Sequence, residues 1–274
     1  MEIALIVIAS VLLVLAILYL IAIMPGTKPL GEPYISTKYA HRGLHDDSLP
    51  ENSLAAFSAA VDAGFGIEFD VRLSKDGKLI VFHDDTLLRM CGVDARVDSK
   101  TYDELLECNL LSTDCKIPTF REVMELVGGS VPLLIEIKED AGNKKVSETL
   151  AEELKGYTGP YIIESFNPLS LGVIKKLMPG VARGFLSQRF LKSENKEYHK
   201  PLYFALQNLL LNRIASPAFI AYDIHGRKSI SLRIARSLLG AATVAWTVRS
   251  PEEEKIAESA GFDTIIFENY IPEK

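Results

Sequence analysis

Two histidines stand at the ends of apolar, strand-like runs in the first third of the chain. His41 closes the run KYAHR and precedes Arg42, while His83 closes the run LIVFHD and precedes Asp84. A pair of imidazoles, one neutral and one protonated, suits a reaction that takes a proton from a nucleophile and gives one to a leaving alkoxide. Arg42 adds a fixed fork of donors that fits a phosphate. These residue types indicate acid–base chemistry beside an anionic group.

Three carboxylates lie on strand-like runs at positions that share one face. In GIEFDV the strand period of two puts Glu68 and Asp70 on one side and apolar residues on the other, and the same parity pairs Glu136 with Lys138 in LLIEIK. Buried like charges repel unless a cation or a shared proton relieves them, so a hard cation such as Mg²⁺ or Ca²⁺ is expected. The alternative is a set of internal ion pairs centred on Lys138.

A single histidine at a strand end is more often structural than catalytic. Two such histidines, together with three inward carboxylates on neighbouring strands, favour the catalytic interpretation. The remaining histidines, His45, His199 and His225, fall in loop or helix contexts, and we interpret them as surface or internally satisfied side chains.

Nine strand-like runs alternate with helical patterns, which is typical of βα units around a mostly parallel sheet. The runs are KYAHR, GIEFDV, LIVFHD, VPLLIEIK, YIIESF, ARGFLS, AFIAYD, ATVAWTV and DTIIF. A TIM-type (β/α)8 barrel needs eight strands and about 250 residues, so we predict such a barrel with one accessory strand. An open doubly wound sheet is the rival, but no Gly-rich phosphate loop follows the first strand. Asn52 or Ser53 should be the N-cap of the first helix after the linker, which should end near Ala63.

An apolar run without charged residues extends from Ile3 to Ile23. As a helix it would be about 31 Å long, close to the thickness of the bilayer hydrocarbon. Glu2 stands where a cleaved signal peptide would carry basic residues. We therefore predict a transmembrane anchor over residues 1–25 and a linker over residues 26–37.

Charge and cysteine content bear on the compartment and on the partners. Lys28, Lys38 and Arg42 follow the apolar run and Glu2 precedes it, so we expect a single-pass protein of the cell membrane with its body on the cytoplasmic side. The net charge of −6, without clustered Lys and Arg, argues against nucleic acid as a partner. Neither a disulfide framework nor a zinc site is expected of the three cysteines, Cys91, Cys108 and Cys115.

Seven motifs together resemble the glycerophosphodiester phosphodiesterase family. They are AHRG, PENSLAAFSAAVDAG, IEFDVRLSKDGKLIVFHDDTLLR, IPTFREVM, LLIEIK, ESF and WTVRS, spread from about Lys38 to Phe267. The first three, in this order and spacing, are specific. The resemblance implies a TIM-type barrel over residues 38–274, one divalent cation, Mg²⁺ or Ca²⁺, and hydrolysis of glycerophosphodiesters to glycerol 3-phosphate and an alcohol.

The resemblance also implies roles for individual residues. The implied acid–base pair is His41 and His83. The implied substrate-binding residues are Arg42, Lys138 and Trp246, and the implied metal ligands are Glu68, Asp70 and Glu136. The segment of about residues 85–117 corresponds to a small inserted lobe. The chain departs from the family at DTIIFENY, where a strand followed by Thr-Asp and proline is usual, and at Arg249, where Asn is common.

Two other functions stay open. An anchored site lies near lipid, so a lysophospholipase D acting on membrane lysolipids is one alternative, and the apolar stretch from Leu202 to Ile214 favours it. That stretch can also be read as the outer helix of a βα unit with a buried face. A non-catalytic, membrane-tethered barrel that binds phosphorylated ligands is the other alternative, but it would not need the acid–base pair.

Overall fold

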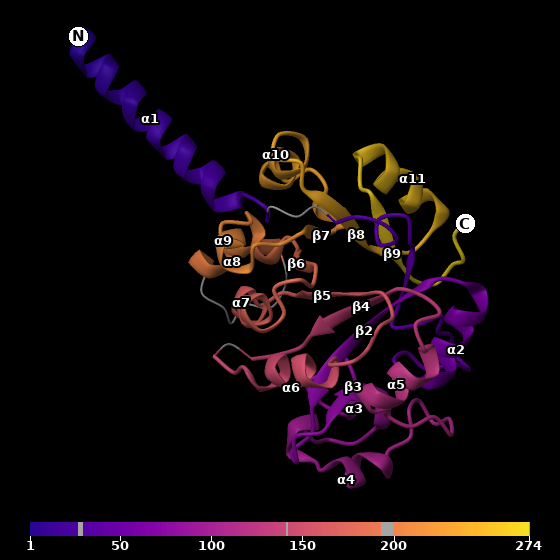
Figure 1. Cartoon of the computed structure of the whole chain (residues 1–274). Coiled ribbons are helices and arrows are strands. Elements are labelled where there is room, and N and C mark those ends of the chain that lie inside the picture. Colours follow the sequence, from indigo (N-terminus) through magenta and orange to yellow (C-terminus); the bar gives the residue numbers. More distant parts are fainter. Residues whose placement is uncertain (27–29, 141, 193–199, 274) are drawn as a thin grey trace.

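A closed parallel barrel of eight strands forms the body of the protein in this computed structural model, which describes residues 1–26, 30–140, 142–192 and 200–273 (Figure 1). β1 pairs with both β2 and β9, which closes the ring. The ring strands are β1 (Tyr39–His41), β2 (Gly66–Leu73), β4 (Leu133–Ile137), β5 (Tyr161–Ser165), β6 (Arg183–Ser187), β7 (Phe219–Asp223), β8 (Ala242–Val248) and β9 (Thr264–Phe267). The TIM-type barrel predicted from the alternation of strands and helices is confirmed.

The ninth strand, β3 (Leu79–Val81), is the accessory strand. It pairs antiparallel with the far end of β2 and lies outside the ring. Because β3 runs back toward the barrel, the residues that follow it return to the rim, where the Phe82 amide donates to the carbonyl of Asp70 at 3.0 Å. His83 therefore reaches the same rim as His41, although its strand runs in the opposite direction.

Helices cover the outside of the ring and leave the barrel interior to the strands. They are α2 (Leu54–Ala63), α5 (Phe120–Val127), α6 (Lys145–Glu153), α7 (Pro168–Leu177), α8 (Lys200–Gln207), α9 (Asn212–Ala215), α10 (Ile230–Ser237) and α11 (Pro251–Ala260). Single 3-10 turns lie at η2 (Phe190–Lys192) and η3 (Ile224–Gly226). Ser53 is the N-cap of α2 and accepts from the Ala56 amide, so of the two predicted caps Ser53 is correct.

Side chains along each strand point alternately toward the surrounding helices and into the barrel. Phe69 of β2 faces outward and packs between Phe57 of α2 and Phe120 of α5, with ring centroids 5.6 and 6.2 Å away. Inside the ring, an apolar layer that includes Tyr39 and Leu134 fills the end near the strand starts. Two residues further along the same strands the inward positions turn polar, so the ionisable layer rests on an apolar floor.

The segment between β3 and α5 forms a lobe with its own small core (Figure 1). It contains α3 (Leu88–Cys91), the 3-10 turn η1 (Val97–Ser99) and α4 (Tyr102–Leu106). The side chains that form this core are Ile80, Phe82, Leu87, Met90, Val97, Leu105, Leu110 and Ile117. All three cysteines lie against or near this core as free thiols.

The helix α1 (Glu2–Ile23) projects away from the barrel, and it is long and apolar enough to cross a membrane (Figure 1). Its last turns dock on the outer helices: the Tyr19 hydroxyl lies 2.7 Å from the hydroxyl of Ser231 in α10, and Asn212 of α9 donates to the Ile23 carbonyl at 2.8 Å. Just after the helix, the Gly26 amide donates to the carbonyl of Pro217.

The apolar stretch between β6 and β7 folds as α8 and α9. Leu206 and Leu209 are buried in the core, so the stretch has the buried face of an outer helix. Leu202 and Phe204 remain 46% and 53% exposed, which leaves an apolar outer face as well. His199 lies outside the described residues.

Candidate active site

The residues singled out from the sequence gather at the carboxyl rim of the barrel. β1 supplies His41, β2 supplies Glu68 and Asp70, and β4 supplies Glu136. Donor atoms of the three carboxylates all lie within 4.8 Å of one another, and each side chain is buried. The strand parity thus brings these groups together as expected.

Lys138 and the β1–α2 loop supply the positive charge around these carboxylates. The Lys138 ammonium lies 2.7 Å from Glu136 and 3.2 Å from Asp70, so the ion pairs of the alternative interpretation are present. Glu68 has only the Arg42 amide, at 3.1 Å, and the His41 ring, at 3.9 Å, as polar partners within the described residues. One ammonium therefore neutralises only part of the cluster.

The pKa values of the three carboxyls also reflect the excess of negative over positive charge in the cluster. Burial, with the charges of Asp70 and Glu136, raises the pKa of Glu68 well above its usual range. Burial and the Asp70 charge outweigh Lys138 and raise the pKa of Glu136 to about 7. For Asp70 burial alone would raise the pKa, but Lys138, His83 and Arg42 hold it well below its usual range. Three oxygen ligands with excess negative charge fit a hard divalent cation.

His41 is held in one orientation between two carboxylates. Its Nδ1 bonds to Glu268, which follows β9, and its Nε2 lies 3.9 Å from Glu68. Burial lowers the pKa of His41 to about 4, so the ring is neutral near pH 7. When Nδ1 carries the proton and donates it in a hydrogen bond to Glu268, the lone pair of Nε2 faces the carboxylate cluster, as a general base requires.

His83 is oriented by the residue that follows it. Its Nδ1 lies 2.6 Å from Asp84, and Arg89 binds the other oxygen of Asp84 at 2.7 Å. Burial lowers the pKa of His83, while Asp70 and Asp84 oppose that effect by favouring the imidazolium. Arg89 also binds Glu51 at 2.7 Å and so joins the lobe to the rim.

The β1–α2 loop folds tightly onto the cluster. Arg42 adopts φ 57° and Asn52 φ 56°, and the Asn52 amide donates to the Arg42 carbonyl at 2.9 Å. The Asn52 side chain donates to Asp70 at 2.9 Å, and Arg42 Nε lies 3.5 Å from the same carboxylate. The sequence assigned Asn52 only a possible capping role, whereas the structure places it beside a predicted metal ligand.

Aromatic side chains form the wall of the site next to Lys138. The Lys138 ammonium lies 5.8 Å from the centroid of the Phe166 ring, and the Trp246 ring meets Phe166 edge-on at 5.4 Å. Trp246 Nε1 is buried and has no hydrogen-bond partner among the described residues, so it remains available as a donor. The structure thus brings Lys138 and Trp246 to one wall, with Phe166 between them.

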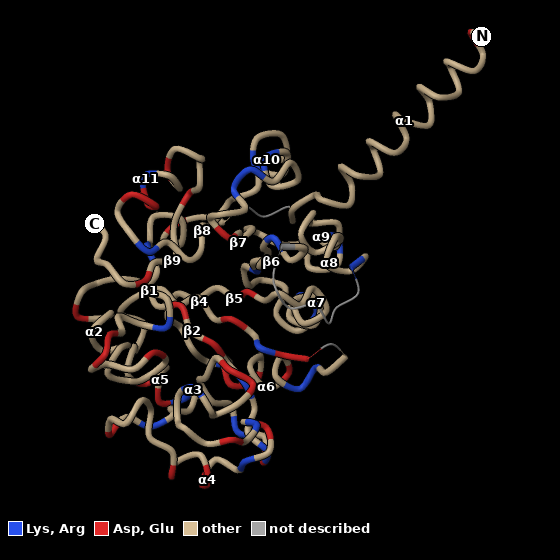
Figure 2. Tube along the Cα trace, turned by 180° about the vertical axis from the view of Figure 1, so that it is seen from behind, with Lys and Arg blue, Asp and Glu red and all other residues tan. Residues whose placement is uncertain are grey.

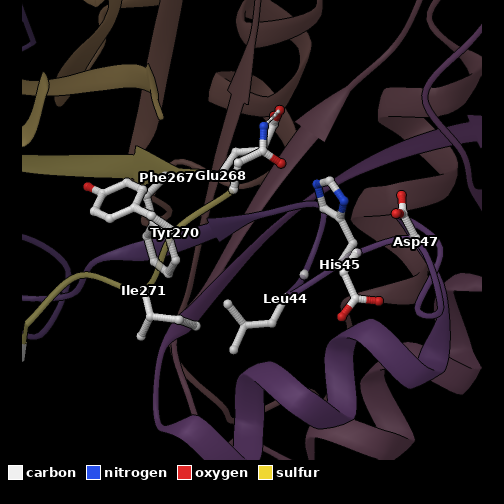
Figure 3. A pocket seen from close by; sticks show the side chains of 10 residues that line it. Leu44, His45, Asp47, Phe267, Glu268, Tyr270 and Ile271 are labelled. Atoms are coloured by element: carbon white, nitrogen blue, oxygen red, sulfur yellow. Dashed lines mark hydrogen bonds between the residues drawn. The ribbon is translucent and has the colours of Figure 1, made fainter. Parts of the chain in front are cut away.

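A pocket of about 420 Å³ lies between the loop that follows β1 and the residues that follow β9 (Figure 3). His45 and Glu268 lie on different segments that line it, and their donor atoms lie within 4.8 Å of each other and of His41. His45 is half-buried here and lies beside His41, whereas His225 is exposed as expected. The sequence signal for Glu268 was the departure at ENY, and Arg249, the other departure, binds Glu268 at 3.2 Å.

The closed (β/α)8 barrel, with buried carboxylates, two oriented imidazoles and an arginine at its carboxyl rim, places the chain in the class of TIM-barrel proteins with an ionisable rim site. The model of the glycerophosphoryl diester phosphodiesterase family matches residues 41–271. The chain belongs to this family.

Individual relatives agree with the family assignment. A glycerophosphodiester phosphodiesterase of Caldanaerobacter subterraneus is 37% identical over 161 residues, which cover 54% of this chain and 65% of that protein. A lysophospholipase D of Rattus norvegicus is 32% identical over 45% of this chain and 42% of its own length. The structure of an Oleispira antarctica phosphodiesterase in complex with the product sn-glycerol-3-phosphate has a TM-score of 0.69 at 25% identity and covers 84% of this chain and 92% of that one. The chain thus spans just under two thirds of the Caldanaerobacter relative.

Proposed function

We propose that the protein hydrolyses glycerophosphodiesters to glycerol 3-phosphate and an alcohol, with one divalent cation held by Glu68, Asp70 and Glu136. The observation that carries the proposal is the placement of His41 and His83 on the rim that holds the buried carboxylates. The Caldanaerobacter relative and the product complex of the Oleispira protein support it. A barrel that only binds a phosphorylated ligand would not require two imidazoles held in fixed orientations.

The roles of the side chains follow from their partners. A bound Mg²⁺ or Ca²⁺ would supply charge stabilisation for the phosphate oxygens. Arg42, already at the edge of the cluster, binds the phosphate, and Lys138 and Trp246 bind the substrate on the aromatic side. His41 accepts the proton of the attacking hydroxyl at Nε2, and His83 donates one to the leaving oxygen. Each proton transfer contributes about 10² to 10⁴ in rate.

A lysolipid is a second candidate substrate, favoured by an aromatic path that leads away from Lys138. The Phe166 ring contacts Phe190 at 5.9 Å, and Phe190 stacks on Tyr203 of α8 at 5.3 Å. Leu202 and Phe204, the neighbours of Tyr203 in the sequence, are exposed. An acyl chain could follow this path from the phosphate site to the apolar outer face of α8.

The direction of α1 favours access from a membrane. Gly26 and Ile23 contact residues that precede β7, whereas Tyr19 contacts Ser231, which follows β7. Followed from Gly26 back toward the N-terminus, α1 therefore passes from the amino end of β7 to its carboxyl end. The exposed part of α1 leaves the domain on the side of the carboxyl rim. We further propose that residues 1–25 anchor the protein in the cell membrane, that residues 26–37 link the anchor to the barrel domain of residues 38–274, and that this domain, with its lobe at about 85–117, is cytoplasmic.

The test uses the purified full chain in detergent. Glycerophosphocholine and lysophosphatidylcholine are supplied separately, with Mg²⁺ or Ca²⁺ and then with EDTA. Metal-dependent release of glycerol 3-phosphate supports the first proposal, and release of lysophosphatidic acid supports the second. If the folded protein with either metal cleaves neither substrate, both proposals are wrong.

A further inference from the structure

A basic groove of about 600 Å³ lies between α10 and α11, and none of the site residues described above lines it. Its charged lining residues are Arg227, Lys228, Arg233, Arg236 and Lys255. Sequence from Ile224 to Pro251 contains no Asp or Glu, although the chain as a whole has a net charge of −6. The groove is therefore a local concentration of positive charge on an acidic protein.

These cations have no carboxylate partners in the described part of the chain, although Arg227 donates to the Ile224 carbonyl at 3.3 Å and Arg236 lies 6.0 Å from the centroid of the Phe262 ring. The acidic residues of α11 do not line the groove, and two of them are engaged elsewhere: Glu254 pairs with Lys38, and Glu253 accepts from the Arg249 amide. Arg236 Nη1 is buried and has no hydrogen-bond partner among the described residues. Such unpaired cations favour an anionic ligand.

The groove lies close to the end of the proposed membrane anchor. Tyr19 in the last turns of α1 contacts Ser231 in the first turn of α10, and both Figure 1 and Figure 2 show α10 beside the end of α1. From Tyr19 back to the N-terminus α1 makes few contacts, so the surface of a bilayer spanned by α1 would lie near the level of Tyr19, where tyrosine is common. Ile230, the neighbour of Ser231, is an apolar side chain with 70% of its surface exposed.

We propose that this groove binds the headgroups of anionic phospholipids in the membrane that α1 spans. The inference rests on the membrane anchoring proposed above. Ile230 enters the interfacial region while the cations contact lipid phosphates, so α10 forms a second contact with the bilayer beside the anchor. Near an anionic surface each Lys or Arg contributes about fivefold in binding, or about 1 kcal/mol. The two contacts together fix the orientation of the barrel relative to the membrane, which one helix alone cannot do.

The test measures which lipid the protein retains. The full chain in detergent is immobilised, equilibrated with mixed micelles of phosphatidylglycerol and phosphatidylcholine in equal amounts, washed, and extracted for lipid analysis. We expect retained lipid with at least fivefold more phosphatidylglycerol than phosphatidylcholine. The variant R227Q/K228Q/R233Q should retain the two lipids in nearly the supplied ratio.

A matched variant controls for the change in net charge. K75Q/K78Q/K116Q removes three exposed lysines on or near the lobe, at the far end of the molecule from α1 (Figure 1), and should behave as wild type. Wild type that retains both lipids equally would overturn the groove proposal, as would enrichment that survives in R227Q/K228Q/R233Q. Wild type that retains no lipid at all would overturn the membrane anchoring as well. Release of glycerol 3-phosphate from soluble glycerophosphocholine, measured on the same preparation, tests the catalytic proposal separately.

Discussion

Glu136→Gln should stabilise the metal-free protein although it removes a proposed metal ligand. The pKa of Glu136 is raised to about 7, chiefly by burial and by Asp70. Relative to a usual value near 4.5, this difference costs the folded state about 3 kcal/mol at pH 7 when the carboxyl ionises. Glutamine is an isostere of the neutral acid, so the variant avoids that cost. The pKa of about 7 already includes the attraction between Glu136 and Lys138, so the loss of this attraction in the variant is not subtracted again from the roughly 3 kcal/mol.

The effect depends on pH with a defined sign. Because the folded-state pKa lies above the unfolded one, the wild type has its full stability below about pH 4.5 and loses stability as pH rises toward 7. The variant lacks this loss, so its advantage should be small at pH 5 and greatest at pH 7 and above. With about 2–4 °C per kcal/mol for a domain of this size, the advantage in Tm at pH 7 is at most about 6–12 °C.

The assay is thermal unfolding of the full chain in detergent, followed by circular dichroism with EDTA and then with Mg²⁺ or Ca²⁺. Saturating metal at about 100 times its Kd should stabilise wild type by about 2.7 kcal/mol and the variant much less. Glu125→Gln, an exposed position on α5, provides the matched control and should leave both Tm values unchanged. A metal-free Glu136→Gln protein that melts below wild type at pH 7 would show that ionised Glu136 does not destabilise the fold, and a variant that gains as much from metal would show that Glu136 is not a ligand.

Three further predictions follow from the site. His41→Ala should lower kcat by about 10² to 10⁴ with the circular dichroism spectrum unchanged, and turnover near wild type would remove His41 from the mechanism. Glu268→Gln should lower kcat by about 10²-fold with little change in KM, because an amide can also donate to Nδ1 and so no longer keeps the proton of His41 there, and an unchanged kcat would exclude a positioning role. Gly43→Ala should cost more stability in urea unfolding than Gly77→Ala, since both have positive φ but only the Cβ at position 43 would meet Ala56, at 2.9 Å; equal costs would contradict this.

Strand parity was the strongest source of correct prediction. An alternation of two fixes which side chains enter the barrel, so Glu68, Asp70 and Glu136 could be placed together without knowing the register between strands. The existence of an accessory strand followed from a count of nine runs. Its identity did not, because β3 is as apolar as the ring strands and differs only in running antiparallel to β2.

Groups that act through loop geometry could not be predicted from the sequence. Asn52 is a good helix cap by type, and its contact with Asp70 depends on the left-handed backbone of Arg42 and Asn52. Glu268 and His45 are far apart in the chain and meet beside His41 only because β9 and β1 are neighbours in the closed ring. The period-two pattern predicts which side chains of a strand share a face. It predicts nothing about these contacts, because they are made by residues that follow the strand ends.

Hydrolysis of a phosphodiester by the rim cluster with a bound cation is the activity proposed for this protein. The most direct measurement is ³¹P NMR of glycerophosphocholine incubated with the full chain, first with Mg²⁺ or Ca²⁺, then with excess EDTA, then with metal restored. We expect that the phosphodiester signal converts to that of glycerol 3-phosphate, that EDTA stops the conversion, and that added metal restores it. Conversion at an unchanged rate in EDTA, or no conversion by the folded protein with either metal, would contradict it.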